Sequence, residues 1–119
     1  MVINSKERRI IKSREDNWKL RSVLMANGKP LTYAVFRSVE IFQEHGCAIC
    51  RRNEFWGALH ADHNKKTGVF RGVLCSDCNH QAVGTYERTG HYKSSENEKI
   101  LQAYLDNTPY QRWLAKESK

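Results

Sequence analysis

Apolar positions at helical spacing predict helices toward both ends of the chain, with β-forming stretches between them. Residues 5–27 are expected to form one highly basic helix, which Gly28 would terminate. The positions expected to be buried on this helix are Trp18, Leu20, Val23 and Leu24. The sequence therefore predicts a basic helical arm over residues 1–29, ahead of a second unit over residues 30–119.

Four more helices are predicted in that second unit, three of them outside its β-forming centre. One is expected to begin at Pro30, and its apolar positions at near-helical spacing are Leu31, Val35, Val39 and Phe42. Near the C-terminus, Ser95 and Glu98 resemble a capping box at the start of a helix. Thr108 and Pro109 then place a capping residue and a first-turn proline ahead of the last helix.

The predicted β-structure lies in the centre of the chain. The stretches "FWGALHAD" and "GVFRGVLC" are rich in apolar and β-forming residues, and "NKKTG" between them is a turn signal. A helix is expected to follow from about Ser76. The predicted fold class is therefore α+β, with a small β-hairpin plus helix flanked by N- and C-terminal helices.

Composition limits the size of the core and the class of partner. With 119 residues, 39% of them hydrophobic, the chain suits a small domain that needs a metal, a crosslink or a partner to hold its fold. Lys and Arg number 20 against 13 Asp and Glu, a formal charge of +7. This balance favours a polyanionic partner such as nucleic acid, although a merely soluble basic protein has the same composition.

The sequence favours a cytoplasmic protein that is neither secreted nor bound to a membrane. No apolar run is long enough to span a bilayer, and the first residues lack the apolar core of a signal peptide. In a reducing compartment, paired cysteines bind metal more often than each other.

Four cysteines form two matched C-x-x-C pairs, "CAIC" and "CSDC". Two such pairs let four thiolates converge on one Zn²⁺ ion, with no open position for chemistry. The alternatives are two disulfides or free thiols. We therefore predict a structural zinc site with Cys47, Cys50, Cys75 and Cys78 as its ligands.

Polar residues beside these pairs suggest a second metal. Asn79 follows Cys78 directly, and the hairpin would lie against the helix that carries it, so Asn79 could face Asp62. A carboxylate oxygen and an amide oxygen suit a hard cation such as Mg²⁺. His63, next to Asp62, could then take a proton from an attacking water.

The stretch "LHADHNKKTGVFRGVLCSDCN" resembles the ββα-metal motif, also called the HNH or His-Me finger motif. It is most similar to the form found in the recombination endonuclease VII family, which suggests a bacteriophage protein. The resemblance spans about residues 46–86 and implies a zinc-stapled finger that carries the catalytic centre.

The resemblance implies a role for each matching residue. Asp62 and Asn79 match the ligands of a catalytic Mg²⁺ or Mn²⁺ ion, and His63 matches the general base. His60 matches a further motif histidine near the scissile phosphate. Arg71 matches an arginine that either contacts phosphate or supports the hairpin. The four cysteines match the ligands of the family's structural zinc.

One position departs from the family pattern. Lys65 stands where the family often carries a second histidine that assists at the phosphate. A lysine still offers positive charge to the transition state. The departure leaves open a catalytically weak or inactive, zinc-stabilised nucleic-acid-binding module as the alternative function.

The sequence thus predicts a metal-dependent DNA endonuclease that leaves 5′-phosphate and 3′-hydroxyl ends. Nicking or homing-like cleavage and resolution of branched DNA are both expected of the family, by a monomer or a homodimer. The basic arm would grip DNA, although a solvated helix face fits equally well. Candidate DNA contacts are Arg71, Lys66, Arg8, Arg9, Lys12 and Arg14. The residues expected to be non-catalytic are His45, His80 and His91, and those expected in the core are Trp18, Trp56 and Trp113.

Overall fold

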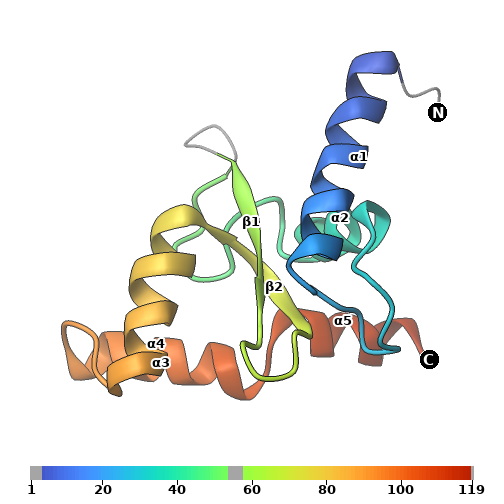
Figure 1. Ribbon diagram of the computed structural model, residues 1–119. Helices are drawn as coiled ribbons and strands as arrows, with labels where there is room; N and C mark the ends of the chain where they lie inside the picture. Colours follow the sequence, from blue (N-terminus) through green and yellow to red (C-terminus); the bar gives the residue numbers. More distant parts are fainter. Residues whose placement is uncertain (1–3, 54–57, 119) are drawn as a thin grey trace.

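The computed structural model describes residues 4–53 and 58–118 of the protein (Figure 1). Trp56 lies outside the described residues. The elements, in chain order, are α1 (Ser5–Leu20), α2 (Tyr33–Phe42), β1 (Leu59–His63), β2 (Phe70–Cys75), the π-helix η2 (Asp77–Val83), α3 (Gly84–Thr89), α4 (Ser95–Asp106) and α5 (Pro109–Glu117).

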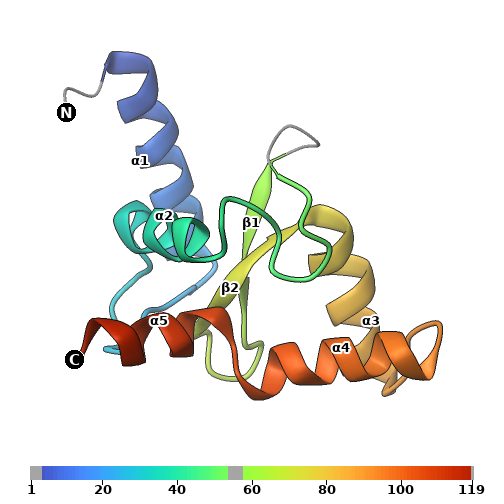
Figure 2. The same cartoon turned by 180° about the vertical axis from the view of Figure 1, so that it is seen from behind.

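The fold is α+β, as predicted, and is built around one antiparallel hairpin. β1 and β2 pair from Leu59 opposite Cys75 to His63 opposite Phe70. Gly68 closes the turn between the strands with a left-handed φ of 79°. α4 and α5 follow one another along one side of the hairpin, as the two opposite views show (Figures 1 and 2).

β2 is buried on both faces because a separate apolar cluster covers each one. The first cluster joins α1, α2, α5 and the hairpin, and includes Trp18, Phe36, Val73 and Tyr110. The second joins the cysteine region, η2 and α4, and includes Cys47, Leu74, Leu101 and Tyr104. Val73 and Leu74, which are neighbours on β2, therefore pack into different clusters.

α1 ends at Leu20 rather than near residue 27, so the predicted helix is too long. Leu20 is 85% exposed, and its prediction as a core residue is wrong. Beyond the helix, the amide of Leu24 donates to Gly68 and its carbonyl accepts from Phe70, both at 2.8 Å. Pairing with the hairpin thus replaces continued helix. The other positions predicted to be buried are buried or half-buried: Trp18, Val23 and Leu24.

α2 begins at Tyr33, not at the predicted Pro30. Pro30 forms an antiparallel bridge with Leu24, and the Thr32 side chain caps the helix by accepting from the Val35 amide. The proline therefore belongs to the segment that pairs with the hairpin rather than to the helix.

The two C-terminal helices begin differently from one another. The predicted capping box at Ser95 is wrong, since Ser94 caps α4 and the Glu98 carboxylate accepts from Tyr92 instead. At α5, Thr108 and Gln111 form a capping box, with Pro109 in the first turn as predicted. Within the described residues, every helix is too short or too polar to cross a membrane.

Candidate active site and zinc site

The four cysteine side chains converge at one point beside the hairpin. Their Sγ atoms all lie within 4.8 Å of one another, and Cys50 and Cys75 approach to 3.6 Å. Thiolates at about 2.3 Å from a tetrahedral zinc ion would be separated by roughly 3.8 Å. All four cysteines are free thiols rather than disulfides. The donor set and its geometry therefore fit one structural zinc ion.

The surroundings of the thiols also suit a cation. The Ile49 amide donates to the Cys47 sulfur at 3.5 Å, and the Cys78 amide donates to the Cys75 sulfur at 3.4 Å. The hydrogen bond to Cys47 raises the pKa of the Cys78 thiol, and burial raises that of Cys50. Four thiolates this close cannot all ionise without a compensating charge, which a divalent metal supplies.

The cysteine cluster joins three segments that carry site residues. It connects the loop after α2, the end of β2 and the π-helix η2, which contains Cys78 and Asn79. η2 is a seven-residue π-helix, a rare geometry that often occurs at functional sites. A metal at this point would hold Asn79 against the hairpin.

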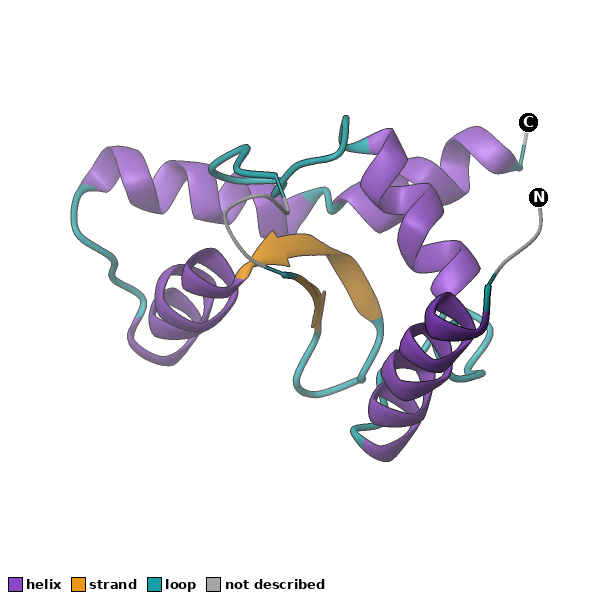
Figure 3. Cartoon of the chain, turned by 90° about the horizontal axis from the view of Figure 1, so that it is seen from above, coloured by secondary structure: helices purple, strands orange, loops and turns teal. Residues whose placement is uncertain are grey.

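A cleft of about 880 Å³ opens over the hairpin. Seen from above, the hairpin lies between α1 on one side and η2 with α3 on the other (Figure 3). Six residues predicted from the sequence as site residues line this cleft: His60, Asp62, His63, Lys65, Asn79 and Arg14. Positions from three distant segments of the chain thus share one concave surface.

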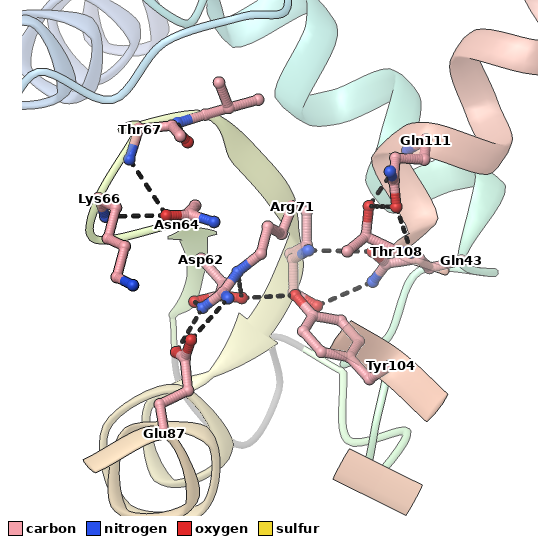
Figure 4. Close-up of polar contacts among 12 residues, drawn as sticks. Gln43, Asp62, Asn64, Lys66, Thr67, Arg71, Glu87, Tyr104, Thr108 and Gln111 are labelled. Carbon is pink, nitrogen blue, oxygen red and sulfur yellow. Dashed lines mark hydrogen bonds and ion pairs between the residues drawn. The ribbon is translucent and has the colours of Figure 1, made fainter. Parts of the chain in front are cut away.

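Asp62 is held by a buried network (Figure 4). Arg71 Nε donates to Asp62 Oδ2 at 2.9 Å and its Nη2 donates to Oδ1 at 3.0 Å. Tyr104 Oη donates to the same Oδ2 at 2.8 Å. The Arg71 guanidinium also donates to both carboxylate oxygens of Glu87, at 3.0 and 2.8 Å.

A β-bulge explains how Arg71 reaches Asp62. The register pairs Asp62 with Gly72 and then His63 with Phe70, which leaves Arg71 as the extra residue of β2. Burial alone would lower the pKa of Arg71, but its hydrogen bonds to Glu87 and Asp62 outweigh burial and raise it. The guanidinium is therefore a permanent cation in this network.

The Asp62 carboxylate retains some capacity for a metal. Its Oδ2 accepts two of the hydrogen bonds above and its Oδ1 accepts one. Because a carboxylate oxygen has two lone pairs, one direction at Oδ1 stays available. Asp62 is only 4% exposed, yet it lines the same cleft as Asn79. A carboxylate oxygen and an amide oxygen are ligand types that a magnesium-type ion prefers.

Three histidines line the cleft, one of them not assigned a role from the sequence. The rings of His60 and His80 meet edge to face, with centroids 5.8 Å apart. Burial, followed by the charges of His80, Arg14 and Arg21, lowers the pKa of His60. A neutral imidazole is the expected state of His60 near neutral pH.

The candidate DNA contacts are scattered rather than gathered in the cleft. Arg71 is 7% exposed and pairs with two carboxylates, which favours the support role over a phosphate contact. Arg14 lines the cleft and donates from Nη2 to the Leu59 carbonyl at 2.6 Å. The remaining candidates are exposed outside the cleft lining: Lys66, Arg8, Arg9 and Lys12.

Sequence reasoning missed three residues that contact the site. Glu87 accepts from Arg71, and Tyr104 donates to Asp62, each from an element far along the chain. The ring of His80 meets that of His60 edge to face. His80 directly follows Asn79 in the sequence, and this adjacency could have indicated that His80 lies near the site. Glu87 and Tyr104 belong to no local motif, and only tertiary packing brings them to the site.

Comparisons with known proteins identify the family of this chain. A family model described as recombination endonuclease VII matches residues 29–107. The Gene 59 protein of Mycobacterium phage D29 is 36% identical over 69 residues, covering 57% of this chain and 40% of the relative. That of Mycobacterium phage L5 is 46% identical over 44 residues, covering 36% of this chain and 27% of the relative.

The chain spans less than half the length of these curated phage relatives. No solved structure matches it. The family model, however, covers well over half of the chain, including both cysteine pairs and the whole hairpin. The chain therefore belongs to the recombination endonuclease VII family.

Proposed function

We propose that the protein is a DNA endonuclease that hydrolyses phosphodiester bonds with the help of Mg²⁺ or Mn²⁺. The family supports a nuclease acting on DNA. The observation that carries the proposal is the shared cleft, in which His63, Asp62 and Asn79 lie together within the family's range. Its phage relatives favour action in the cytoplasm of a host cell.

In the proposed reaction, His63 is the general base. It takes a proton from a water molecule whose oxygen attacks phosphorus, while the bond from phosphorus to the 3′ oxygen breaks. The departing 3′ oxygen takes a proton from solvent. The products would carry 5′-phosphate and 3′-hydroxyl ends.

Asp62 Oδ1 and the Asn79 side-chain oxygen would hold the divalent ion. When bound, the ion supplies positive charge that stabilises the transition state and the departing oxygen. Arg71 and Tyr104 act as positioning residues, because they fix the Asp62 carboxylate through three hydrogen bonds. Lys65 and His60 would contribute to binding the scissile phosphate from within the same cleft.

Cleavage of supercoiled plasmid and of a four-way junction tests this function. Each substrate is incubated with wild-type protein under three conditions: with added Mg²⁺, with added Mn²⁺, and with protein that has been dialysed to remove both ions. Dialysis is preferable to a chelator, which could also strip zinc. Metal-dependent nicking, linearisation or junction resolution supports an endonuclease and identifies its substrate, and sedimentation with DNA separates a monomer from a homodimer.

His63→Ala is the critical variant. It should abolish cleavage while zinc content, circular dichroism and DNA binding stay as in the wild type. His45→Ala, which changes an exposed histidine outside the cleft, is the matched control. If His63→Ala cuts at the wild-type rate, the proposed general base is wrong.

A DNA-binding module without cleavage is the second candidate. Two observations favour it, namely the three hydrogen bonds already made to Asp62 and the lysine at position 65. Tight binding of plasmid and junction with no product under any metal condition would select this function.

A further inference from the structure

α1 is fixed to the body of the protein by its second half. Trp18 is 5% exposed, and its ring lies 5.1 Å from that of Phe36. The Arg14 guanidinium stacks 4.5 Å over Phe36 and donates to the Leu59 carbonyl. Glu15 accepts from the Tyr33 amide at 2.7 Å. These contacts make this half of α1 a rigid element rather than a loose arm.

One face of α1 borders the cleft. The helical residues that line it are Ile10, Arg14, Asn17 and Trp18, and Arg21 at the C-cap continues the row. Their spacing of three and four residues marks a single helical stripe. Arg8, Arg9 and Lys12 lie off this stripe, so the basic residues of α1 are divided between two faces.

The cleft is cationic on both sides of the hairpin. Arg14 and Arg21 contribute from the α1 side, and Lys65 and Arg88 from the hairpin turn and α3. Asp62 and Glu87, the two acidic residues that line it, are already paired with Arg71. The side chains left facing the open space thus favour a phosphate backbone.

We propose that α1 forms the second wall of the nucleic-acid cleft, where Arg21 binds a backbone phosphate near the cleavage site and Asn17 hydrogen-bonds the same strand. This inference rests on the proposed function. α1 lies outside the residues matched by the family model, so this wall is a feature of this chain in addition to the family core.

The proximity of Arg21 to the histidines supports this arrangement. Arg21 lines the same cleft as His60, His63 and His80, so its guanidinium borders the space in which the scissile phosphate would lie. Arg21 is exposed, and its backbone amide donates to the carbonyls of Asn17 and Lys19. The side chain is therefore free to change without loss of the helix end.

The test measures binding of a short fluorescein-labelled DNA duplex by anisotropy, without divalent metal, over a range of salt concentrations. Arg21→Gln should bind roughly 5- to 10-fold more weakly, with a salt slope lower by about 1, because one phosphate contact is lost. Asn17→Ala keeps the helix, because alanine has a high helix propensity. It should weaken binding roughly 2- to 5-fold with an unchanged salt slope, because no charge is lost. Lys19→Gln is the matched control, since it removes one charge from the same turn but lies off the cleft-lining stripe.

The outcomes separate this inference from the proposed function. If the wild type cuts DNA and Arg21→Gln binds with unchanged affinity and slope, the α1 wall is wrong and the endonuclease stands. Equal weakening by Lys19→Gln also overturns the wall, because general charge then explains the effect. If the wild type binds no DNA, both proposals fail. Circular dichroism and zinc content confirm that each variant is folded.

Discussion

Arg71 binds both carboxylate oxygens of Asp62, with Nε 2.9 Å from Oδ2 and Nη2 3.0 Å from Oδ1. The two side chains are 9% and 5% exposed, so the pair is almost fully withdrawn from solvent. The residue proposed to hold the metal is thus oriented from the neighbouring strand, by a side chain that a β-bulge turns toward it.

Arg71→Lys should impair both stability and cleavage. Lysine keeps the positive charge but lacks the planar fork that binds Asp62 and Glu87 together. We expect the free energy of unfolding to fall by on the order of 2 kcal/mol and cleavage to fall more than tenfold. Urea unfolding and plasmid cleavage measure the two effects, with the α5 surface change Arg112→Lys as control. A variant as stable and active as the wild type would remove the positioning role.

Gly72→Ala should destabilise the protein through a direct clash. A Cβ at this position would lie 2.9 Å from the Tyr104 hydroxyl and 3.1 Å from the Pro109 ring. We expect a loss of about 1–3 kcal/mol in urea unfolding. Tyr104→Phe removes the clashing oxygen, so the double variant should lose less than the sum of the two single losses. Strict additivity would contradict the contact. Gly84→Ala, whose added Cβ meets only ordinary contacts, is the stability control.

Purified protein should contain one zinc ion per chain, as measured by elemental mass spectrometry. Cys78→Ser should lose zinc and native near-ultraviolet circular dichroism, because the site links three segments that the small core does not hold alone. Removing zinc from the wild type should lower the Tm by roughly 10 °C or more. Ser76→Ala, between two ligands, should keep its zinc. A metal-free protein with an unchanged Tm would exclude a structural role.

The pKa of His60 should lie below the ordinary value for histidine. Burial and nearby positive charges disfavour the imidazolium, so the folded protein binds this proton more weakly than the unfolded chain. His60 therefore contributes to stability above the ordinary pKa, and this contribution decreases as pH falls toward the folded value. Histidine NMR titration measures the shift. Arg21→Gln should raise the pKa of His60, and an unchanged value would contradict their interaction.

Lys65→His should raise the rate of DNA cleavage if Lys65 limits the rate of the chemical step. The change restores the histidine that the family often carries and leaves Asp62 and Asn79 untouched. We expect a several-fold increase in the single-turnover rate, which is well below the roughly 10²–10⁴-fold that a fully positioned acid–base group contributes. Lys66→His, at the next position of the same turn but outside the cleft lining, should bring no gain. An equal gain from both variants would contradict a specific role for position 65, because any histidine in the turn would then have the same effect.

Much of this protein was predictable because its signals are local. The two C-x-x-C pairs predicted a four-cysteine site, and the thiols do converge. The hairpin follows from two β-forming stretches around a turn, and the last helix from Thr108 and Pro109. Asp62, His63 and Asn79 line one cleft. Their catalytic roles stay predictions.

Other features were decided by contacts between distant residues. Helix propensity could not indicate that α1 ends at Leu20, because pairing of Leu24 with the hairpin ends it. No local pattern links Tyr104 to Asp62, which are 42 residues apart, or shows that a bulge turns Arg71 inward.

The sequence by itself determined the four-cysteine cluster, the hairpin and the family, since each depends on residue types at short spacing. Only the tertiary structure decided that Arg71 supports Asp62 and that α1 borders the cleft. Those outcomes depend on how apolar faces pack and which buried charges find partners, and both are properties of the whole fold.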